Sequence, residues 1–318
     1  MKLLKDFVVA LNFVSALIGA GLASGKEVVV FLGNANLFSV ILCGVLIGIF
    51  SYPFIILGIK NNGDILGGIF GKYQWIGNLI VKFINFIFLV AMLGGAEAIL
   101  YQLLGIRNGA FIMAIVTLLL YELGNNFIKS ICSITVPLVL VFLLVLYWFK
   151  NSKIIGGFFI LSPLLYAGMN TTCAGIYAGN YCTKLNSKDA SVICIIIAIF
   201  ISLFLTMVRS IVVGAESQEI PLYSVAKDTN LDIFGAIIII SSILTSCLSS
   251  LKLAVKRKGM NAYVVCMLAL VLSSIGFGNV IKFVYPFIGI VGLGILIIAS
   301  IRALPIKLKF CKKLGLDL

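Results

Sequence analysis

The chain has 318 residues, of which 62% are hydrophobic, and its mean hydropathy is +1.20. Soluble domains contain roughly 45–50% apolar residues, so this composition excludes an ordinary soluble protein and predicts one that lies in a lipid bilayer. Lys and Arg outnumber Asp and Glu by 24 to 11, an excess that in membrane proteins reflects topology, so we expect no nucleic-acid partner.

Apolar runs long enough to cross a bilayer recur along the whole chain, which predicts an all-α polytopic membrane protein. We expect about ten transmembrane helices, at about residues 7–33, 36–59, 76–104, 108–122, 126–149, 155–179, 190–213, 232–254, 261–279 and 281–303. Basic residues are concentrated in the connections on one side, which predicts that both termini are cytoplasmic. The spans divide into halves of five, residues 1–151 and 152–318, and an odd-numbered half can repeat only with inverted orientation. The first 25 residues also resemble a signal peptide, but the apolar run continues beyond them, so we expect no cleavage.

The first predicted span carries glycines and charges that a simple membrane anchor does not need. Gly19, Gly21 and Gly25 lie close together and are followed directly by Lys26 and Glu27. Glycine weakens a helix, and charged side chains at membrane depth are costly. We therefore expect the helix to be interrupted here.

The sixth predicted span, the first of the second half, has a similar composition. Both spans contain the pattern S-x-L-x-x-A-G, and the middle of the sixth contains Pro163, Gly168, Asn170, Thr171, Thr172 and Gly175. Two interrupted helices at matching positions of inverted halves are typical of a transporter binding site. The alternative is that the small residues serve close packing between helices.

The longest predicted connection, residues 214–232, is also the most acidic one, and the expected topology puts it outside the cell. Connections of this length usually have a function or lack fixed structure. Its central Ile220, Pro221 and Leu222 predict a segment that packs against the rest of the protein.

Residues 19–27, Gly-Ala-Gly-Leu-Ala-Ser-Gly-Lys-Glu, resemble the GAGFASGQE signature of YkvI-type bacterial membrane proteins. The similarity continues at residues 166–170, 219–222 and 284–289, and so extends over essentially the whole chain. Lys26 departs from the family pattern, because it places a charge where the pattern has a neutral Gln. The wider similarity is to the amino acid–polyamine–organocation superfamily. It implies a bacterial inner-membrane protein with a LeuT-like fold, a five-plus-five inverted repeat and discontinuous helices 1 and 6.

The resemblance also implies a Na⁺ site between the first and eighth spans. It would join the carbonyl groups of Ser15 and Ile18 to the hydroxyl groups of Ser242, Thr245 and Ser246. The last three residues are spaced i, i+3 and i+4 and therefore share one helical face. Oxygen donors suit a hard cation. The alternative is that these hydroxyls bond their own helix backbone.

We expect the solute site at the two interruptions and at a carboxylate of the third span. The predicted substrate-binding residues are Ala20, Gly21, Ser24, Gly25, Glu97, Tyr166, Asn170 and Thr171. Glu97 lies among apolar residues, where a carboxylate could carry a proton, pair with Lys26 or recognise a substrate amine. A position near the outer end of the span, in reach of water, is the alternative. Glu27 and Lys26 are candidates for a proton site or a gate, or for the rim of an outer vestibule.

These features predict a secondary transporter that moves a small amino-acid-like or amine solute by alternating access. Na⁺ or H⁺ is the expected coupling ion, and no other cofactor or metal is expected. The chain has no histidine, which disfavours an enzyme, and no phosphate-binding P-loop, which disfavours an ATP-driven pump. The alternatives are a receptor or assembly protein that keeps a transporter fold without transport, and a passive channel. The expected partners are the lipid bilayer and a small-molecule solute.

Overall fold

The computed structural model describes residues 2–18, 20–123, 125–183, 185–255 and 260–304. Within these ranges the protein is all-α, with one isolated bridge between Ala35 and Gly157 and no strand. Five helical stretches of this part of the chain are long and apolar enough to cross a membrane, at Leu37–Lys60, Ile65–Leu104, Asp189–Ile211, Asp232–Ala254 and Phe277–Ala303. The predicted all-α architecture with membrane-length apolar helices is therefore confirmed. Gly19, the basic residues at 256–258 and the C-terminal residues from 305 onward lie outside the described ranges.

The helices follow most of the predicted spans to within a few residues. They are α1 (Lys2–Leu17), α2 (Ala20–Ser24), α3 (Lys26–Leu32), α4 (Leu37–Lys60), α5 (Ile65–Phe70), α6 (Gln74–Leu104), α7 (Gly109–Glu122), α8 (Asn125–Phe149), α9 (Leu161–Ala178), α10 (Ser187–Ile211), α11 (Pro221–Asp228), α12 (Asp232–Ala254), α13 (Met260–Ser273), α14 (Phe277–Asn279) and α15 (Tyr285–Ala303). A π-helical turn, Val280–Val284, joins α14 to α15. Helices α7 and α13 have 14 residues each, fewer than the about 20 that a bilayer span needs.

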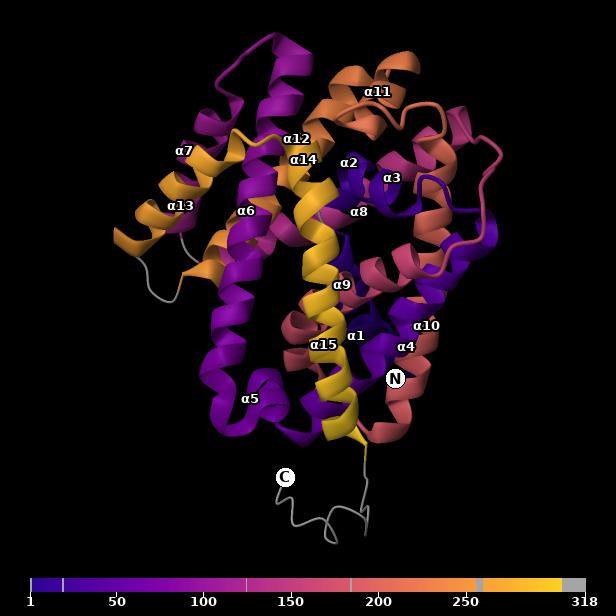
Figure 1. The fold of residues 1–318 in the computed structure, drawn as a ribbon, viewed down its shortest axis with the longest axis vertical. Helices are drawn as coiled ribbons and strands as arrows, with labels where there is room; N and C mark the ends of the chain where they lie inside the picture. Colours follow the sequence, from indigo (N-terminus) through magenta and orange to yellow (C-terminus); the bar gives the residue numbers. More distant parts are fainter. Residues whose placement is uncertain (1, 19, 124, 184, 256–259, 305–318) are drawn as a thin grey trace, which may run out of the picture.

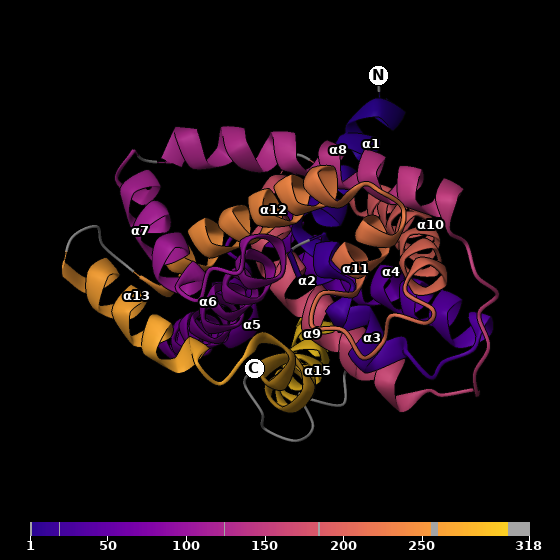
Figure 2. The ribbon, with the colours of Figure 1, turned by 90° about the horizontal axis from the view of Figure 1, so that it is seen from above.

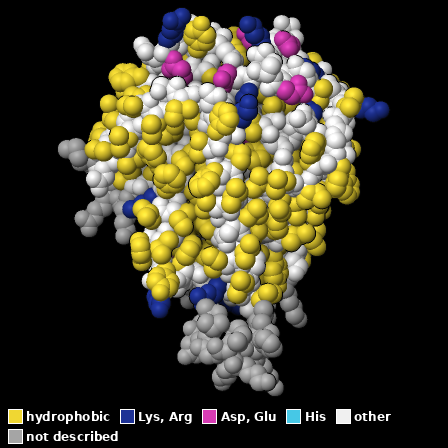
Figure 3. Space-filling view, viewed as in Figure 1, with side chains coloured by type: hydrophobic (Ala, Val, Ile, Leu, Met, Phe, Trp, Pro, Cys, Tyr) yellow, Lys and Arg dark blue, Asp and Glu magenta, His cyan; other side chains and the backbone are white. Residues whose placement is uncertain are grey.

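The surface has the distribution expected of a protein that sits in a membrane. Helices α6 and α15 run along the long axis of the molecule, and α8 and α12 are strongly tilted (Figures 1 and 2). Hydrophobic side chains cover the middle of the molecule, and most charged side chains gather at its two ends (Figure 3). In this view the acidic side chains lie only at the upper end, where α11 is found.

Helices from the two halves of the chain pack directly against each other. Contacts join α1 to α9, α4 to α10, α6 to α12, and α7 to α13. Two short helices lie at opposite ends of the molecule, α5 at the lower end and α11 at the upper end (Figure 1). Each of these short helices connects two long ones, because α5 lies between α4 and α6 and α11 lies between α10 and α12.

The predicted interruption in the first span is confirmed. Helix α1 ends at Leu17, α2 covers five residues, and α3 begins at Lys26 after a second break. Gly25 makes this second break with φ 77°, in the left-handed region that favours glycine. The Ser24 hydroxyl donates to the Gly21 carbonyl and accepts a hydrogen bond from the Lys26 amide, so it stabilises the turn between α2 and α3.

The predicted interruption in the sixth span is wrong, because α9 is one continuous helix from Leu161 to Ala178. Pro163 falls in its first turn, where the amide groups have no partner within the helix, so the proline costs no hydrogen bond. Gly168 and Gly175 are contact positions: a Cβ on them would collide with Leu293 of α15 and with the Phe54 ring of α4. These glycines therefore serve helix packing, which is the alternative that small residues allow.

The start of the sixth span is also later than predicted. Residues 151–159 form no helix and run beside residues 34–36, where the Asn36 amide donates to the Gly157 carbonyl at 2.8 Å. The Gly157 amide in turn donates to the Asn34 carbonyl at 2.9 Å. The connection between the two halves is thus bonded to the segment after α3, and its Ser152 amide donates to the Ser210 carbonyl of α10 at 3.1 Å.

The long connection after α10 packs against the interrupted first span, as its apolar centre predicts. Ile220 and Leu222 are fully buried, and a Cβ on Gly25 would lie 3.0 Å from the Leu222 Cγ. Pro221 starts α11, a position that suits its missing amide hydrogen. Burial, and after it the nearby Asp232 carboxylate, raises the pKa of the Tyr223 phenol above its usual value.

Candidate functional site

Glu27 lies in the first turn of α3, directly after the second break, and only 8% of its surface is exposed. Its side chain folds back over α2, because a Cβ on Gly21 would overlap the Glu27 carboxyl group. The Tyr166 hydroxyl of α9 donates a hydrogen bond to Glu27 Oε2 over 3.4 Å. Gly21 therefore leaves room for a buried carboxylate, and α9 supplies its hydrogen-bond donor.

The neighbouring basic side chains are engaged elsewhere. Lys26 extends away from Glu27, and its Nζ donates to the Gln218 carbonyl at 2.6 Å. Arg209, which is 3% exposed, pairs with Glu216 at 3.3 Å and donates to carbonyl groups at the far end of α3. Among the described residues, no Lys or Arg nitrogen lies within ion-pair distance of the Glu27 carboxylate. An isolated buried carboxylate is costly unless a proton or a cation neutralises it.

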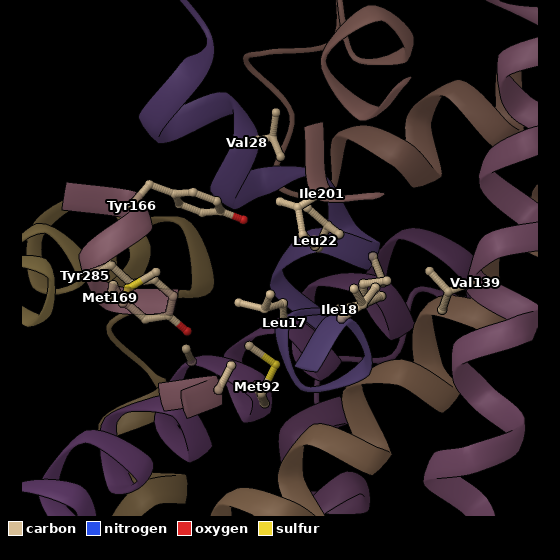
Figure 4. Packing of buried hydrophobic residues seen from close by; sticks show 14 of the residues in the cluster. Leu17, Ile18, Leu22, Val28, Met92, Val139, Tyr166, Met169, Ile201 and Tyr285 are labelled. Carbon is tan, nitrogen blue, oxygen red and sulfur yellow. The ribbon is translucent and has the colours of Figure 1, made fainter. Parts of the chain in front are cut away.

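Two buried tyrosines border the carboxylate. Tyr166 stacks at a tilt on Phe31 of α3, and Tyr285 of α15 meets Phe88 of α6 edge-on, with ring centroids 5.3 and 5.2 Å apart. In Figure 4 the two tyrosines lie on one side and Leu17 and Leu22 of the first span lie opposite. The Tyr285 hydroxyl interacts electrostatically with Glu27 and has no hydrogen-bond partner among the described residues.

Buried polar groups nearly always have a hydrogen-bond partner, so unpaired ones deserve notice. Besides Tyr285, the Thr171 hydroxyl of α9 is buried and unpaired in the part of the chain that the structure describes. Cys173, half-buried on the same helix, also interacts electrostatically with Glu27. The sequence predicts Thr171 as a site residue but does not single out Tyr285 or Cys173, because neither residue type is unusual in an apolar helix.

A small cavity lies beside Tyr166, between the first span and helices α4, α9 and α10. Its volume is about 10 Å³, and it is lined by Leu17, Leu22, Ile47, Tyr166, Asn170, Ile201, Phe204 and Leu205. That space holds about one water molecule. The cavity is therefore too small for a molecule of the size of an amino acid.

Of the other predicted solute residues, the structure brings Asn170 to this cavity and leaves Glu97 apart from it. Asn170 donates from Nδ2 to the Tyr166 carbonyl, one turn earlier in α9, at 3.1 Å. Glu97 lies near the end of α6, and its Oε2 accepts a hydrogen bond from the Ala110 amide at the start of α7. A separate hollow of about 490 Å³ at that end includes Glu97 and Arg107. This location agrees with the alternative in which Glu97 reaches the outer end of its span.

Ala20, Gly21, Ser24 and Gly25 form the interrupted segment itself, as the sequence predicts. They shape the interruption: Gly21 gives space for the Glu27 carboxyl group, the Ser24 hydroxyl bonds the turn, and Gly25 breaks the helix with its left-handed conformation. Thr172, beside the predicted Thr171, donates to the Gly292 carbonyl of α15 at 2.9 Å and thus belongs to the helix contact.

The residues of the predicted Na⁺ site lie in α1, α12 and the interruption between α1 and α2. Ser242 and Thr245 are buried in α12, and their hydroxyls donate to α12 carbonyls, at Ile238 over 2.8 Å and at Ser242 over 3.0 Å. This is the self-bonding arrangement common in membrane helices. Ser15 and Ser246 are half-buried, and Ile18 is the last described residue before the break.

The upper end of the site is covered by the connection after α10. Lys26 of α3 bonds the Gln218 carbonyl, and Glu219 accepts a hydrogen bond from the Gly278 amide in α14 at 3.1 Å. Lys26 therefore binds the cover above the site, which agrees better with a gate position than with a solute contact. These bonds join three segments that are distant in the sequence.

No family model matches this sequence, and neither does any curated protein.

Proposed function

We propose that this protein is a secondary transporter of the bacterial inner membrane that moves a small solute by alternating access. The observation that carries the proposal is the Glu27 carboxylate, buried without a cation at the interruption of the first span. Ionisable groups inside a membrane protein mark ion and substrate pathways by default. An interrupted helix is tolerated at that depth where protein or a watery cavity satisfies its backbone.

The division into two inverted halves, residues 1–151 and 152–318, is supported by the short helices. In each half, the second and third long helices are joined through one short helix, α5 in the first half and α11 in the second. The two short helices lie at opposite ends of the molecule, as inversion requires (Figure 1). The contacts of α1 with α9, α4 with α10, α6 with α12 and α7 with α13 also support it, because an inverted repeat brings equivalent helices together around a two-fold axis.

A proton is the coupling ion that the site favours. The Glu27 carboxyl can bind and release a proton, and the burial of its charge makes the neutral form favourable. We propose that both termini are cytoplasmic, because the basic residues of the sequence are concentrated in the connections on that side.

The test is solute-driven proton movement in reconstituted vesicles that contain a pH-sensitive dye. Small amines and amino acids are added one at a time to vesicles with wild-type protein, Glu27→Gln, or the matched surface variant Asp228→Asn, whose carboxylate is exposed. Wild-type and Asp228→Asn vesicles are expected to change internal pH with at least one solute, and Glu27→Gln vesicles are not. Binding of a solute without any flux would favour the receptor alternative, and flux that never saturates would favour a channel.

A second measurement separates Na⁺ from H⁺. The purified protein is melted in NaCl, KCl and choline chloride at equal ionic strength, beside a Thr245→Ala/Ser246→Ala variant. Ligands that bind only the folded state raise its stability. Identical melting in the three salts is expected for proton coupling, and a Na⁺-selective rise that the double variant loses would assign the coupling to Na⁺.

A further inference from the structure

We propose that the solute is a small apolar amine, bound as its ammonium ion in place of the Glu27 proton. The protein then exchanges one ammonium ion for one proton. This inference rests on the proposed transport function and names its substrate class. It follows from three observations: the site has one negative charge, the nearby basic side chains are bonded elsewhere, and the cavity is lined mainly by apolar residues.

The site has one negative group and lacks a built-in positive one. The ionisable groups that face Glu27 are Tyr166 and Cys173 from α9 and Tyr285 from α15. Two basic side chains are described on the elements packed against α3. Arg209 in α10 is engaged with the far end of α3 and with Glu216, and Lys282 in the π-helical turn is exposed. The negative charge of Glu27 can be neutralised by a positively charged ligand or by a proton.

A zwitterionic amino acid fits this site less well. Its carboxylate would need a cation or free amide groups, and among the described residues no basic side chain is available at the cavity. Of the amide groups at the start of α3, that of Lys26 is used, because it donates to Ser24 Oγ. A second buried charge without a partner would carry a high desolvation cost.

The cavity wall is suited to a hydrocarbon group. Six of its eight lining residues are aliphatic or aromatic without a polar atom: Leu17, Leu22, Ile47, Ile201, Phe204 and Leu205. An ammonium group has three hydrogens to donate. Glu27 and the unpaired Tyr285 hydroxyl offer acceptors for two of them on the tyrosine side of the site. The ligand would thus direct its charged end toward Glu27 and its apolar end toward the leucines of the first span.

Charge balance makes the two cargoes exclusive and couples them. The reaction is Glu27–COOH + R–NH₃⁺ → Glu27–COO⁻···⁺H₃N–R + H⁺, in which one proton leaves for each ammonium bound. Both loaded forms have no net charge at the site, whereas the empty form carries a buried carboxylate. Since an unpaired charge inside the membrane is costly, the empty form is disfavoured during reorientation, and exchange is the favoured cycle.

The test uses hexylammonium chloride as the probe, with purified full-length protein in detergent and a weak buffer. Wild-type protein and the surface variant Asp228→Asn are expected to release about one proton per hexylammonium bound and to melt at a higher temperature with the probe. Glu27→Gln should lose both responses. Lowering the pH within the range in which Glu27 is protonated should weaken wild-type binding by about tenfold per pH unit, because proton and probe compete. Hexanoate and norleucine, matched in chain length, should produce neither response.

The probe-free melting temperature of Glu27→Gln shows whether that variant folds, and Glu27→Asp gives a second measure. Glu27→Asp keeps a carboxyl group and should still release a proton on binding, although with lower affinity. Hexylammonium binding without proton release, or equal stabilisation by norleucine, would overturn the inference. Proton release in detergent without exchange in vesicles would contradict the transport function but support the amine site. Proton-coupled flux of norleucine would contradict the amine site but support the transport function.

Discussion

The first span and α9 contain the same pattern, S-x-L-x-x-A-G, at Ser15–Gly21 and Ser162–Gly168, yet one is interrupted and the other is continuous. The difference lies in what faces the glycines. Gly21 faces the carboxyl group of Glu27, which folds back over it, whereas Gly168 faces Leu293 and the Gly289 carbonyl of α15. Gly21 thus leaves space for a carboxyl group, and Gly168 allows close packing of α9 against α15.

The neighbours of the two segments explain why only one of them breaks. Helix α9 lies between α4 and α15 and contacts both closely along its length, so its backbone groups are best satisfied within the helix. The first span instead ends under the connection that contains Leu222, and Gly25 adopts φ 77° there. Glycine content alone therefore does not interrupt a membrane helix, and the local neighbours decide.

The largest effect is expected from Gly21→Ala. The added Cβ would overlap the Glu27 carboxyl group and displace it from its position beside Tyr166. A hydrogen bond to a charged group contributes ~1.5–3 kcal/mol, so hexylammonium binding should weaken roughly 10- to 100-fold. The melting temperature should change little, because the end of a flexible side chain can move. Unchanged affinity for the probe would show that Gly21 serves packing, as Gly168 does.

The next effect concerns the contact of α9 with α15. A Cβ on Gly292 would lie 2.6 Å from the Gly168 carbonyl oxygen and 3.1 Å from the Met169 nitrogen, and these backbone atoms cannot move independently of the helix. Gly292→Ala should therefore destabilise the protein by ~1–3 kcal/mol, measured by denaturant titration in detergent. Gly294→Ala is the matched control, because a Cβ there meets nothing within 4 Å. Equal stability of the two variants would contradict the close approach of α9 and α15.

The sequence predicts the positions of most helices, because polar residues between the long apolar runs mark where each helix ends. It also predicts the interruption near Gly25, where glycine and charged residues coincide. It does not predict the continuity of α9 or the roles of Glu97 and Arg209. Those properties depend on contacts with residues far apart in the chain, such as the amide at the start of α7 that Glu97 binds.

A smaller effect is expected at the turn between α2 and α3. Gly25→Ala must keep φ 77° and would bring a Cβ within 3.0 Å of Leu222 and Val212. Gly214→Ala is the control, since Gly214 has φ 85° and open space around it. The left-handed conformation costs an alanine about 1 kcal/mol, so we expect that loss for Gly214→Ala and about 1 kcal/mol more for Gly25→Ala. Equal losses of stability in the two variants would mean that Leu222 and Val212 do not contact the turn at Gly25 closely.

The smallest effect is expected from Pro163→Ala. The sign of its stability change distinguishes a continuous α9 from a helix that is interrupted like the first span. A proline that interrupts a helix disfavours it by about 3 kcal/mol relative to alanine, so removing it would stabilise the protein by an amount of that order. In the structure Pro163 lies in the first turn of α9. The first amide that donates within the helix is that of Leu164, which bonds the Ile160 carbonyl, so the missing amide hydrogen of Pro163 costs no hydrogen bond. Pro163→Ala should therefore give no such gain and a loss of under about 1 kcal/mol from reduced contact and a less restricted unfolded chain. A gain of about 2–3 kcal/mol in denaturant titration would show that α9 is held under strain at its start, and that the two segments are more alike than their backbones indicate.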